Sequence, residues 1–296
     1  MPGAPRRWPF VTAHVNVEDA VDHLVVVSDL HGVREPLDAL DDRLSAVDAS
    51  YRVFVNGDLF EGGIDPEYAL AWAQRHAPGR TTLGNHEGRI FAYRRGVITG
   101  APASLWARDG ELGAYESLSD AQLRFVEELP DVLLVLWRGL TIRILHGHHN
   151  LNTEGFTPFL ISSGDLMDLF GDAEVDMTII AHTHYPFVME RDGARLANSG
   201  SISAPLCRFH GVRGQMVNRC PADETVPDHD IRSSFLSITE VDGRPHVTIE
   251  RFDYDRTGHL TRCEQLEGLK MPIAARRKWV HGVLCDACLM SAVEDD

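Results

Sequence analysis

The chain has 296 residues, of which 44% are hydrophobic, so it is long enough to bury a substantial core as one large domain with appendages. Its 28 lysines and arginines against 44 aspartates and glutamates give a formal net charge of −16. This acidity argues against a protein that follows a nucleic-acid backbone or docks on an anionic membrane. It leaves room for a small anionic substrate held through bound cations.

The N-terminal segment contains two arginines but lacks the apolar stretch of a secretory signal, and no later hydrophobic run is long enough to span a membrane. The five cysteines are an odd number, which is not typical of a disulfide framework. We therefore expect a cytoplasmic protein.

From about residue 24 the sequence alternates short β-branched runs with helical stretches, as in βαβ units whose sheet is covered on both faces. The first unit is predicted to contain a strand over LVVVS, a helix opened by Glu35 and Pro36, and a strand over YRVFVN. A second helix, PEYALAWAQRH, leads to the strand TTLG. Ser119 and Gln122 have the spacing of a capping box, which predicts a helix that ends near Pro130.

The second half of the chain is richer in strands. The run VLLVLWRGLTIRIL predicts a hairpin with its turn at residues 138–139, and two more hairpins are expected to turn at residues 192–193 and 242–243. The segment 205–232 is rich in Gly, Pro, Arg and Asp, which favours a long surface loop. A helix is expected after Met271.

Five hydrophobic runs end in polar residues, and these are VVVSDLHG, VFVNGDLFEGG, TTLGNHEG, IRILHGHH and TIIAHTHY. In open α/β sheets, ligands bind beyond the carboxyl ends of the strands, so five such ends can converge on one site. Asp29 and His31 are two residues apart, as are His182 and His184. A strand would place the two members of each pair on the same face, where both could hold one object.

The polar side chains at these ends are imidazoles, carboxylates and one amide: Asp29, His31, Asp58, Asn85, His146, His182 and His184. A lone histidine or aspartate is usually an ordinary solvated or capping residue, whereas this joint pattern indicates a metal centre. Seven such groups exceed the protein ligands of one ion but suit two divalent ions that share a bridging carboxylate. Nitrogen and oxygen donors without thiolate are typical of Mn, Fe, Zn, Co or Ni.

The ordered motifs SDLHG, NGDLFEGG, GNHEG, LHGHH and AHTH resemble those of the calcineurin-like metallophosphoesterase superfamily over residues 24–203. Two later segments, NSGSIS and RFDYD, resemble its bacterial small phosphoesterase branch. The resemblance implies an α/β fold, a four-layer α/β/β/α sandwich of two mixed sheets with the metals at the strand ends. We accordingly divide the chain into an N-terminal extension (1–23), a metallophosphoesterase domain (24–255, with the insertion 205–232) and a C-terminal extension (256–296).

The resemblance also implies roles for individual residues. It implies two ligand sets bridged by Asp58: Asp29, His31 and His184 for one ion, and Asn85, His146 and His182 for the other. It suggests that His86 is a general acid or a phosphate contact rather than a ligand. Glu61, three residues after Asp58, could orient His86.

Three further residues are candidate substrate contacts. Arg34 and Arg89 each follow a motif closely enough to meet a phosphate, although an exposed arginine at a helix start explains them equally well. His148, just after the LHGH motif, could line the site. Relatives that act on phosphoproteins have Asp-Arg-Gly after this GD motif, whereas the present chain has Phe-Glu-Gly-Gly at residues 60–63, which argues against a protein phosphatase.

Cys285 and Cys288, with His281 four residues before the first, resemble half of a zinc site. The other half is missing unless Cys263 supplies it. We therefore expect these residues to serve ordinary packing.

The expected function is hydrolysis of a phosphate ester or anhydride by a hydroxide that bridges two divalent ions. A small organic phosphate or nucleotide is the expected substrate, because the sequence shows neither a basic groove nor stacking aromatics for a nucleic-acid polymer. The alternatives are hydrolysis of dinucleoside polyphosphates or UDP-linked lipid precursors, and a non-catalytic scaffold of the same fold. A scaffold should have lost ligand positions, and this sequence has lost none. The oligomeric state is not indicated.

Overall fold

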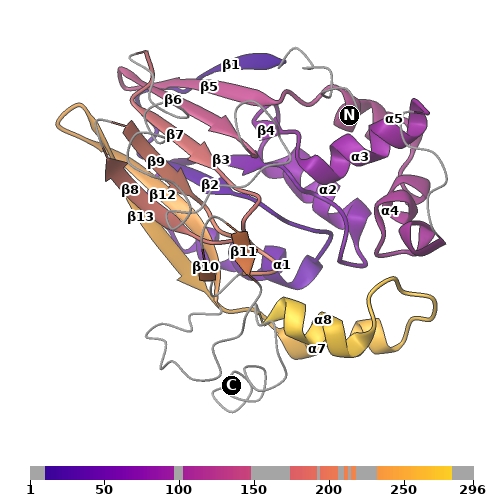
Figure 1. The fold of residues 1–296 in the computed structure, drawn as a ribbon. Coiled ribbons are helices and arrows are strands. Elements are labelled where there is room, and N and C mark those ends of the chain that lie inside the picture. Colours follow the sequence, from indigo (N-terminus) through magenta and orange to yellow (C-terminus); the bar gives the residue numbers. More distant parts are fainter. Residues whose placement is uncertain are drawn as a thin grey trace.

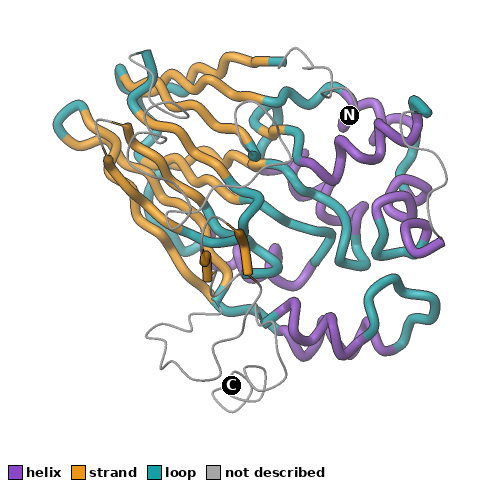
Figure 2. The backbone as a smooth tube through the Cα atoms, viewed as in Figure 1, coloured by secondary structure: helices purple, strands orange, loops and turns teal. Residues whose placement is uncertain are grey.

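The computed structural model describes residues 11–96, 103–147, 174–191, 194–205, 210–212, 215–217 and 232–281. These residues form a six-stranded sheet, a five-stranded sheet and a small two-stranded sheet. In Figure 1 the two large sheets lie together on one side of the molecule, and the helices α1 to α5 gather on the other. Figure 2 shows the same division between strands and helices along the backbone.

The five-stranded sheet has the order β13-β12-β2-β3-β4. Its strands are β2 (His23–Val27), β3 (Tyr51–Asn56), β4 (Thr81–Thr82), β12 (Ser233–Val241) and β13 (Arg244–Phe252). Strands β2, β3 and β4 are parallel, and β12 and β13 are antiparallel to their neighbours. The parallel strands consist of nearly continuous apolar runs because both faces of the sheet are covered. Because these three strands are parallel, their carboxyl ends lie at the same edge of the sheet.

Five α-helices and one 3₁₀ helix are inserted between β2 and β5. They are α1 (Arg34–Ser45), α2 (Pro66–His76), α3 (Asn85–Arg94), η1 (Ala103–Trp106), α4 (Glu111–Ser117) and α5 (Asp120–Glu127). The predicted capping box begins α5, where the Ser119 amide donates to the Gln122 carboxamide oxygen at 2.9 Å. The apolar faces of α1 and α2 pack on the five-stranded sheet through Leu37, Leu40 and Leu70.

The six-stranded sheet has the order β1-β5-β6-β7-β9-β8. Its strands are β1 (Thr12–Asn16), β5 (Val132–Trp137), β6 (Leu140–Leu145), β7 (Met177–Ile180), β8 (Phe187–Arg191) and β9 (Ala194–Asn198). Strand β1, which comes from the predicted N-terminal extension, pairs in parallel with β5. The predicted β5–β6 turn is confirmed, since Arg138 (φ 49°) and Gly139 (φ 78°) are both left-handed.

An apolar layer between the two large sheets forms the second core. Leu24, Val26 and Phe54 of the five-stranded sheet pack against residues such as Leu133 and Ile142 of the six-stranded sheet. The predicted α/β fold with two mixed sheets is confirmed. The helical layer expected on the outer face of the six-stranded sheet has no member within the described part of the chain.

The predicted C-terminal extension begins with two helices, α7 (Arg256–Glu264) and α8 (Ile273–Val280), which we call the C-terminal hairpin (Figure 1). It packs beside α1. Within the predicted loop 205–232, two short antiparallel strands are described, β10 (His210–Val212) and β11 (Gln215–Val217). Of the helices that the structure describes, none has the length and apolar character to cross a membrane.

Candidate metal centre

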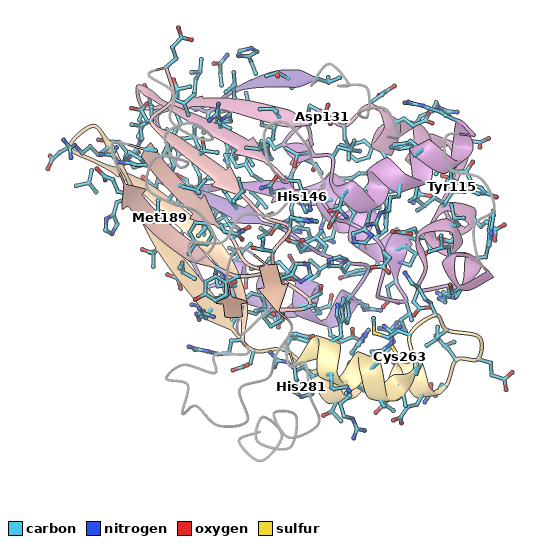
Figure 3. All side chains as sticks on the ribbon, viewed as in Figure 1. Tyr115, Asp131, His146, Met189, Cys263 and His281 are labelled. Carbon is cyan, nitrogen blue, oxygen red and sulfur yellow. The ribbon has the colours of Figure 1, made fainter. Side chains whose placement is uncertain are left out.

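The predicted ligands lie in the segments that follow β2, β3, β4, β6 and β7. In Figure 3, His146 occupies the middle of the molecule, between the strand ends and the helices. Seven predicted ligands, far apart in sequence, are thereby brought to one edge of the two sheets. We define Asp29, His31 and His184 as the first cluster and Asp58, Asn85, His146 and His182 as the second cluster.

Five of the predicted ligands have a left-handed backbone conformation: Asp29 (φ 54°), His31 (φ 50°), Asp58 (φ 53°), His182 (φ 67°) and His184 (φ 57°). The prediction that the Asp-x-His and His-x-His pairs share a strand face is therefore wrong in its geometry. Each pair lies in a turn just beyond its strand, and the turn brings the side chains together. Such a conformation costs an L-residue on the order of 1 kcal/mol, and residues that keep it concentrate at functional sites.

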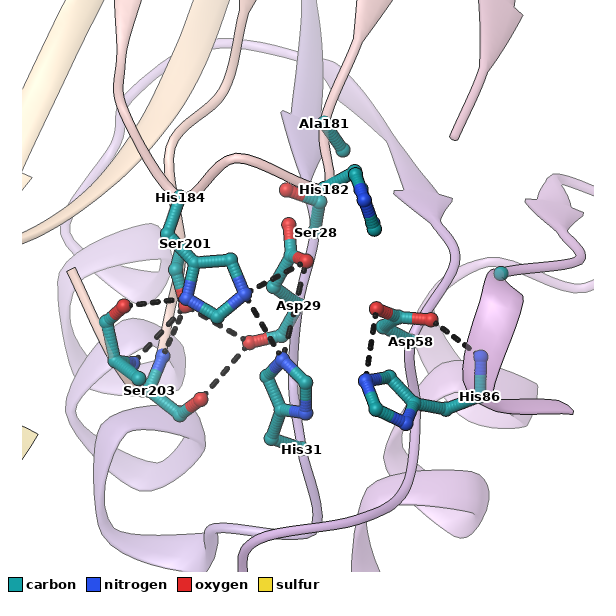
Figure 4. Close-up of polar contacts among 12 residues, drawn as sticks. Ser28, Asp29, His31, Asp58, His86, Ala181, His182, His184, Ser201 and Ser203 are labelled. Carbon is teal, nitrogen blue, oxygen red and sulfur yellow. Dashed lines mark hydrogen bonds and ion pairs between the residues drawn. The ribbon is translucent and has the colours of Figure 1, made fainter. Parts of the chain in front are cut away.

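In the first cluster, ring nitrogens and a carboxylate converge on a common point (Figure 4). The Nε2 atoms of His31 and His184 are 3.1 Å apart. They lie 3.9 and 3.2 Å, respectively, from Oδ1 of Asp29. Both carboxylate oxygens of Asp29 are buried, and neither accepts a hydrogen bond of good geometry.

The tautomers of the two histidines explain why this point suits a cation. His31 Nδ1–H donates to the Glu61 carbonyl at 2.8 Å, and His184 Nδ1–H donates to the Ala204 carbonyl at 2.6 Å. Because a carbonyl only accepts, each Nδ1 carries a proton, and each ring in its neutral form turns the Nε2 lone pair inward. Two lone pairs and an unsatisfied carboxylate at such distances require a proton or a metal ion between them.

The second cluster repeats this arrangement. His146 Nδ1–H donates to the Asn56 carbonyl at 2.7 Å, and His146 Nε2 lies 3.0 Å from Oδ2 of Asp58 and 3.1 Å from the amide oxygen of Asn85. That amide oxygen is also 2.6 Å from Nδ1 of His182. His146 Nε2 is 4.0 Å from Oδ1 of Asp29, so the two clusters adjoin. The donor set fits two neighbouring divalent ions.

The net effect of burial and neighbouring charges is to raise the pKa of two of the four histidines in the clusters and to lower the pKa of the other two. Burial opposes protonation of His146 and His184, but the carboxylates of Asp58 and Asp29 outweigh it, raising the pKa of His146 to about 10 and that of His184 above its ordinary value. Burial and a charged neighbouring histidine lower the pKa of His31 and of His182 to about 4. In the metal-free protein, a proton on His146 therefore supplies positive charge beside Asp58, and Asp29 favours the protonated form of His184.

His86 lies at the start of α3, beside both clusters. Its amide donates to Oδ1 of Asp58 at 3.1 Å, and its ring Nε2 is 3.7 Å from Oδ2 of the same residue (Figure 4). Its Nδ1–H donates to Oε1 of Glu111 at 2.9 Å. Glu61 is 3.8 Å away, too far for a hydrogen bond, and its other carboxylate oxygen pairs with Lys270. Glu111, and not Glu61, is thus the carboxylate that orients His86.

The His86–Glu111 contact is electrostatically strong. Burial would raise the pKa of Glu111, but hydrogen bonds from His86 and Arg89 lower it to about 2. Burial opposes protonation of His86, but the charge of Asp58 and the hydrogen bond to Glu111 raise its pKa to about 9. The Arg89 guanidinium donates to Oε1 of Glu111 at 2.8 Å, so Arg89 reaches the site through this carboxylate.

Glu87, the acidic residue of the GNHEG motif, has a role that we did not predict. Its buried carboxylate accepts backbone hydrogen bonds from the amides of Asp58 (3.1 Å), Leu59 (2.8 Å), Phe60 (3.3 Å) and Gly84 (3.0 Å). Burial and the charge of Asp58 raise its pKa to about 7, whereas these four donors favour the ionised form. Glu87 therefore joins the loop that carries Asp58 to the start of α3. Its spacing from Gly84 is that of a capping box.

The NSGSIS segment supports the first cluster, which we also did not predict. The hydroxyls of Ser201 and Ser203 donate to the Asp29 carbonyl at 3.1 and 2.9 Å (Figure 4). The Ser28 hydroxyl donates to the Gly200 carbonyl at 2.9 Å. These bonds tie the turn after β2 to the segment after β9. They fix the backbone from which Asp29 projects.

The remaining predicted residues lie elsewhere or outside the described part of the chain. Arg34 is exposed, donates to Asp38 at 3.1 Å and lies over the ring of Tyr68, so the structure does not bring it to the clusters. His148, Cys285 and Cys288 fall outside the described residues. Cys263 is buried, with its sulfur 3.5 Å from Nε2 of His259, and burial raises the pKa of its thiol to about 11.

Comparisons with known proteins agree with this geometry. A sequence model for calcineurin-like phosphoesterases matches residues 23–215. No curated protein matches the chain significantly. A metallophosphoesterase from Sphaerobacter thermophilus superimposes with a TM-score of 0.64 at 18% identity, covering 88% of this chain and 99% of the other. The hypothetical protein PH1004 from Pyrococcus horikoshii OT3 superimposes with a TM-score of 0.66 at 16% identity, covering 89% and 99%.

Proposed function

The chain belongs to the calcineurin-like phosphoesterase family, and from this premise we propose that it hydrolyses small phosphate esters or anhydrides with two divalent metal ions. The single observation that carries the proposal is the inward-facing donor set. His31, His184 and His146 each donate through Nδ1 to a backbone carbonyl, which leaves each Nε2 facing a buried carboxylate. This arrangement is costly in the metal-free protein and is relieved by cations.

Divalent ions in such a site supply a water of lowered pKa and neutralise charge on phosphoryl oxygens. The proposed ligands are Asp29, His31 and His184 for one ion and Asn85, His146 and His182 for the other, with Asp58 shared. Their backbone hydrogen bonds fix the ring tautomers before any ion arrives. Mn, Fe, Zn, Co and Ni are all compatible with these donors.

His86 is proposed to donate a proton to the leaving oxygen. Its pKa of about 9 keeps it protonated near neutral pH, and the carboxylate of Glu111 would stabilise this form even where a cation offsets the charge of Asp58. The Nε2 atom, not engaged by Glu111, faces Asp58 and is the one that can give up the proton.

A small organic phosphate or nucleotide is the proposed substrate. Two cations pair with the carboxylates beside His86, Lys270 with Glu61 and Arg89 with Glu111. A polyphosphate would need further unpaired positive charge, so this pairing favours a monoester or diester over a dinucleoside polyphosphate or a UDP-linked lipid precursor. The remaining alternative is a scaffold without activity.

The test of the proposal is a substrate screen of the protein reconstituted with Mn²⁺, Co²⁺, Ni²⁺ or Zn²⁺. The substrates are p-nitrophenyl phosphate, its bis-ester, cyclic nucleotides and dinucleoside polyphosphates. We expect turnover of a monoester or a diester. Absence of turnover with every metal would favour the scaffold.

The role of His86 is tested with leaving groups of different basicity. We expect His86→Asn to retain its metals and to lose about 10²- to 10⁴-fold in kcat on a nucleotide ester, because an alkoxide needs a proton to leave. The loss should be much smaller on the nitrophenyl ester of the same bond type. Equal losses on both substrates would assign His86 to stabilisation of the phosphoryl oxygens. His76→Asn, on α2 beside Asp41, is the matched control.

A further inference from the structure

The C-terminal hairpin lies outside residues 23–215 that match the family, yet it contacts the loop that supports the first cluster. This loop follows β3 and includes residues 60–63. The ring of Trp279 on α8 meets the ring of His31 edge to face, with centroids 5.8 Å apart at 77°. A Cβ on Gly62 would lie only 2.8 Å from the Trp279 ring, so the loop and the hairpin are in close contact.

Arg276 of the hairpin forms a fully buried ion pair with Asp109, just before α4, and a hydrogen bond to this loop. The guanidinium of Arg276 donates to Oδ2 of Asp109 at 2.5 Å, and its other terminal nitrogen donates to the Gly62 carbonyl. Asp109 also accepts hydrogen bonds from the amides of Lys270 (2.6 Å) and Met271 (2.9 Å), between the two helices. The Gly62 amide in turn donates to the Asp109 carbonyl at 2.9 Å. Gly62 is therefore held on both sides.

The preceding peptide group of this loop, between Glu61 and Gly62, orients the predicted ligand His31. The Glu61 carbonyl, which precedes Gly62, accepts the Nδ1–H of His31 at 2.8 Å. The Gly63 amide donates to the His31 carbonyl at 2.7 Å. The loop thus holds both the ring and the backbone of His31. The Phe60 carbonyl lies 3.2 Å from the same Nδ1 atom, so both acceptors belong to this loop, and a shift of the loop would rotate the imidazole or release its tautomer.

The rest of the hairpin is attached to the same region through charged groups. Arg262 pairs with Glu35 at 2.5 Å and also with Asp65, and His259 Nδ1–H donates to Glu35 at 3.0 Å. A buried ion pair contributes little more to stability than an apolar pair of the same shape, but it imposes one geometry. The charged contacts of the hairpin thus reach Glu35, Asp65 and Asp109, near the starts of α1, α2 and α4, and they indicate control of position rather than simple burial.

We infer that the C-terminal hairpin is a positioning element of the metal centre: Arg276, paired with Asp109, fixes the Glu61–Gly62 peptide so that the Glu61 carbonyl holds His31 with its Nε2 atom toward the first cluster. This inference rests on the metal centre of the proposed function. It makes affinity at the first cluster depend on a segment that the family model does not include. Residues that orient a metal-binding histidine typically change metal affinity by about 10- to 100-fold when they are lost.

The test compares Arg276→Met with Arg277→Met by isothermal titration with Mn²⁺ alone. Arg277 is the next residue of α8, is half exposed and lies 3.9 Å from Glu264, so its replacement controls for a lost arginine on this helix. We expect Arg276→Met to weaken one of two binding events by about 10- to 100-fold, with the other retained. Arg277→Met should behave as wild type. Two wild-type binding events in a folded Arg276→Met protein would overturn the inference.

Two further measurements keep the test decisive. If Arg276→Met does not fold, Arg276→Lys replaces it, because its ammonium can keep the pair with Asp109 but cannot also reach the Gly62 carbonyl. Nitrogen-15 NMR of the metal-free protein reports the His31 tautomer directly. We expect a single Nδ1–H form in wild type and a mixture in the Arg276 variants. An unchanged tautomer would overturn the inference, whereas a wild type that binds no Mn²⁺ would count against the proposed function instead.

Discussion

The two ligand clusters have similar donors but are supported by different parts of the chain. In the second cluster, His146 is held by the carbonyl of Asn56, the last residue of β3, and the Asp58 loop is held by Glu87 of α3. In the first cluster, His31 and His184 are held by the loop carbonyls of Glu61 and Ala204. One cluster is therefore built on regular elements, and the other on loops that meet from distant parts of the chain.

This difference has a physical consequence. A ring held by a strand or a helix inherits the rigidity of that element, whereas a ring held by a loop depends on what holds the loop. The serines of the NSGSIS segment and the C-terminal hairpin supply that support for the first cluster. We expect perturbations to affect the two clusters unequally, apart from those at Asp58, the carboxylate that we propose both ions share.

The largest effect is expected for Asp58→Asn. Because we propose that both ions share Asp58, this change should weaken both clusters together and leave no difference between them. Loss of the shared charge should lower metal occupancy and reduce hydrolysis at least about 100-fold. Elemental analysis and initial rates measure these effects. Asp48→Asn, an exposed position after α1, is the control. Full activity with two ions bound to Asp58→Asn would exclude the bridging role.

The pH dependence of metal affinity should reveal the protons that the ions displace. His146 has a pKa of about 10, so it stays protonated in the metal-free protein through neutral pH, and the Asp29 carboxylate raises the pKa of His184 above its ordinary value. Affinity should rise with pH, about tenfold per unit for each proton released, until the pH passes the raised pKa. Titrations in buffers of different ionisation enthalpy should show that protons are released when the metal binds. Affinities that do not change between pH 6 and 8 would contradict this.

Glu87→Gln should weaken the hydrogen bonds that support the Asp58 loop of the second cluster. The carboxamide offers one acceptor oxygen where two oxygens now receive four backbone amides, and its own NH₂ would face donors. We expect the free energy of unfolding to fall by about 1–3 kcal/mol, measured by urea denaturation, since buried donors lose their acceptor. Glu116→Gln, exposed on α4, should change it little. A fall of equal size in both variants would remove the special role of Glu87.

The smallest effect is expected for Ser203→Ala, which removes one of two hydroxyls that donate to the Asp29 carbonyl. The free energy of unfolding should fall by about 0.5–1.5 kcal/mol. Metal affinity should weaken at the first cluster and not at the second. Ser45→Ala, at the exposed end of α1, serves as the reference. An equal change in affinity at both clusters would show that their supports are not independent.

The sequence predicted the elements whose local pattern is strong. α1, α2 and α5 have apolar spacing and clear starts, and the β5–β6 turn has the residues that its left-handed conformation favours. We did not predict α3, which begins at Asn85 and includes Gly88, because these are weak helix formers. Its first turn depends on Glu87, whose carboxylate accepts the Gly84 amide, and Ile90 and Phe91 bury its apolar side.

The motifs brought the ligand residues to attention, but not the groups that support them. Glu111 begins the seven-residue helix α4, and nothing in its local sequence indicates that it meets His86, 25 residues earlier. Arg276 and Asp109 are 167 residues apart, and only the fold pairs them. Contacts of this kind arise from tertiary packing, which a local pattern does not encode. The sequence of β1, in the predicted N-terminal extension, likewise does not indicate that its strand partner is β5.

Five of the predicted ligands occupy left-handed backbone positions that glycine would adopt with less strain, and this bears on why polar residues are found there. At Asp29, His31, Asp58, His182 and His184, glycine would adopt the same backbone without steric cost and would remove a buried polar group. Selection for folding alone would thus favour losing these side chains one by one. The presence of polar side chains at all five positions is what we expect if the site binds metal ions.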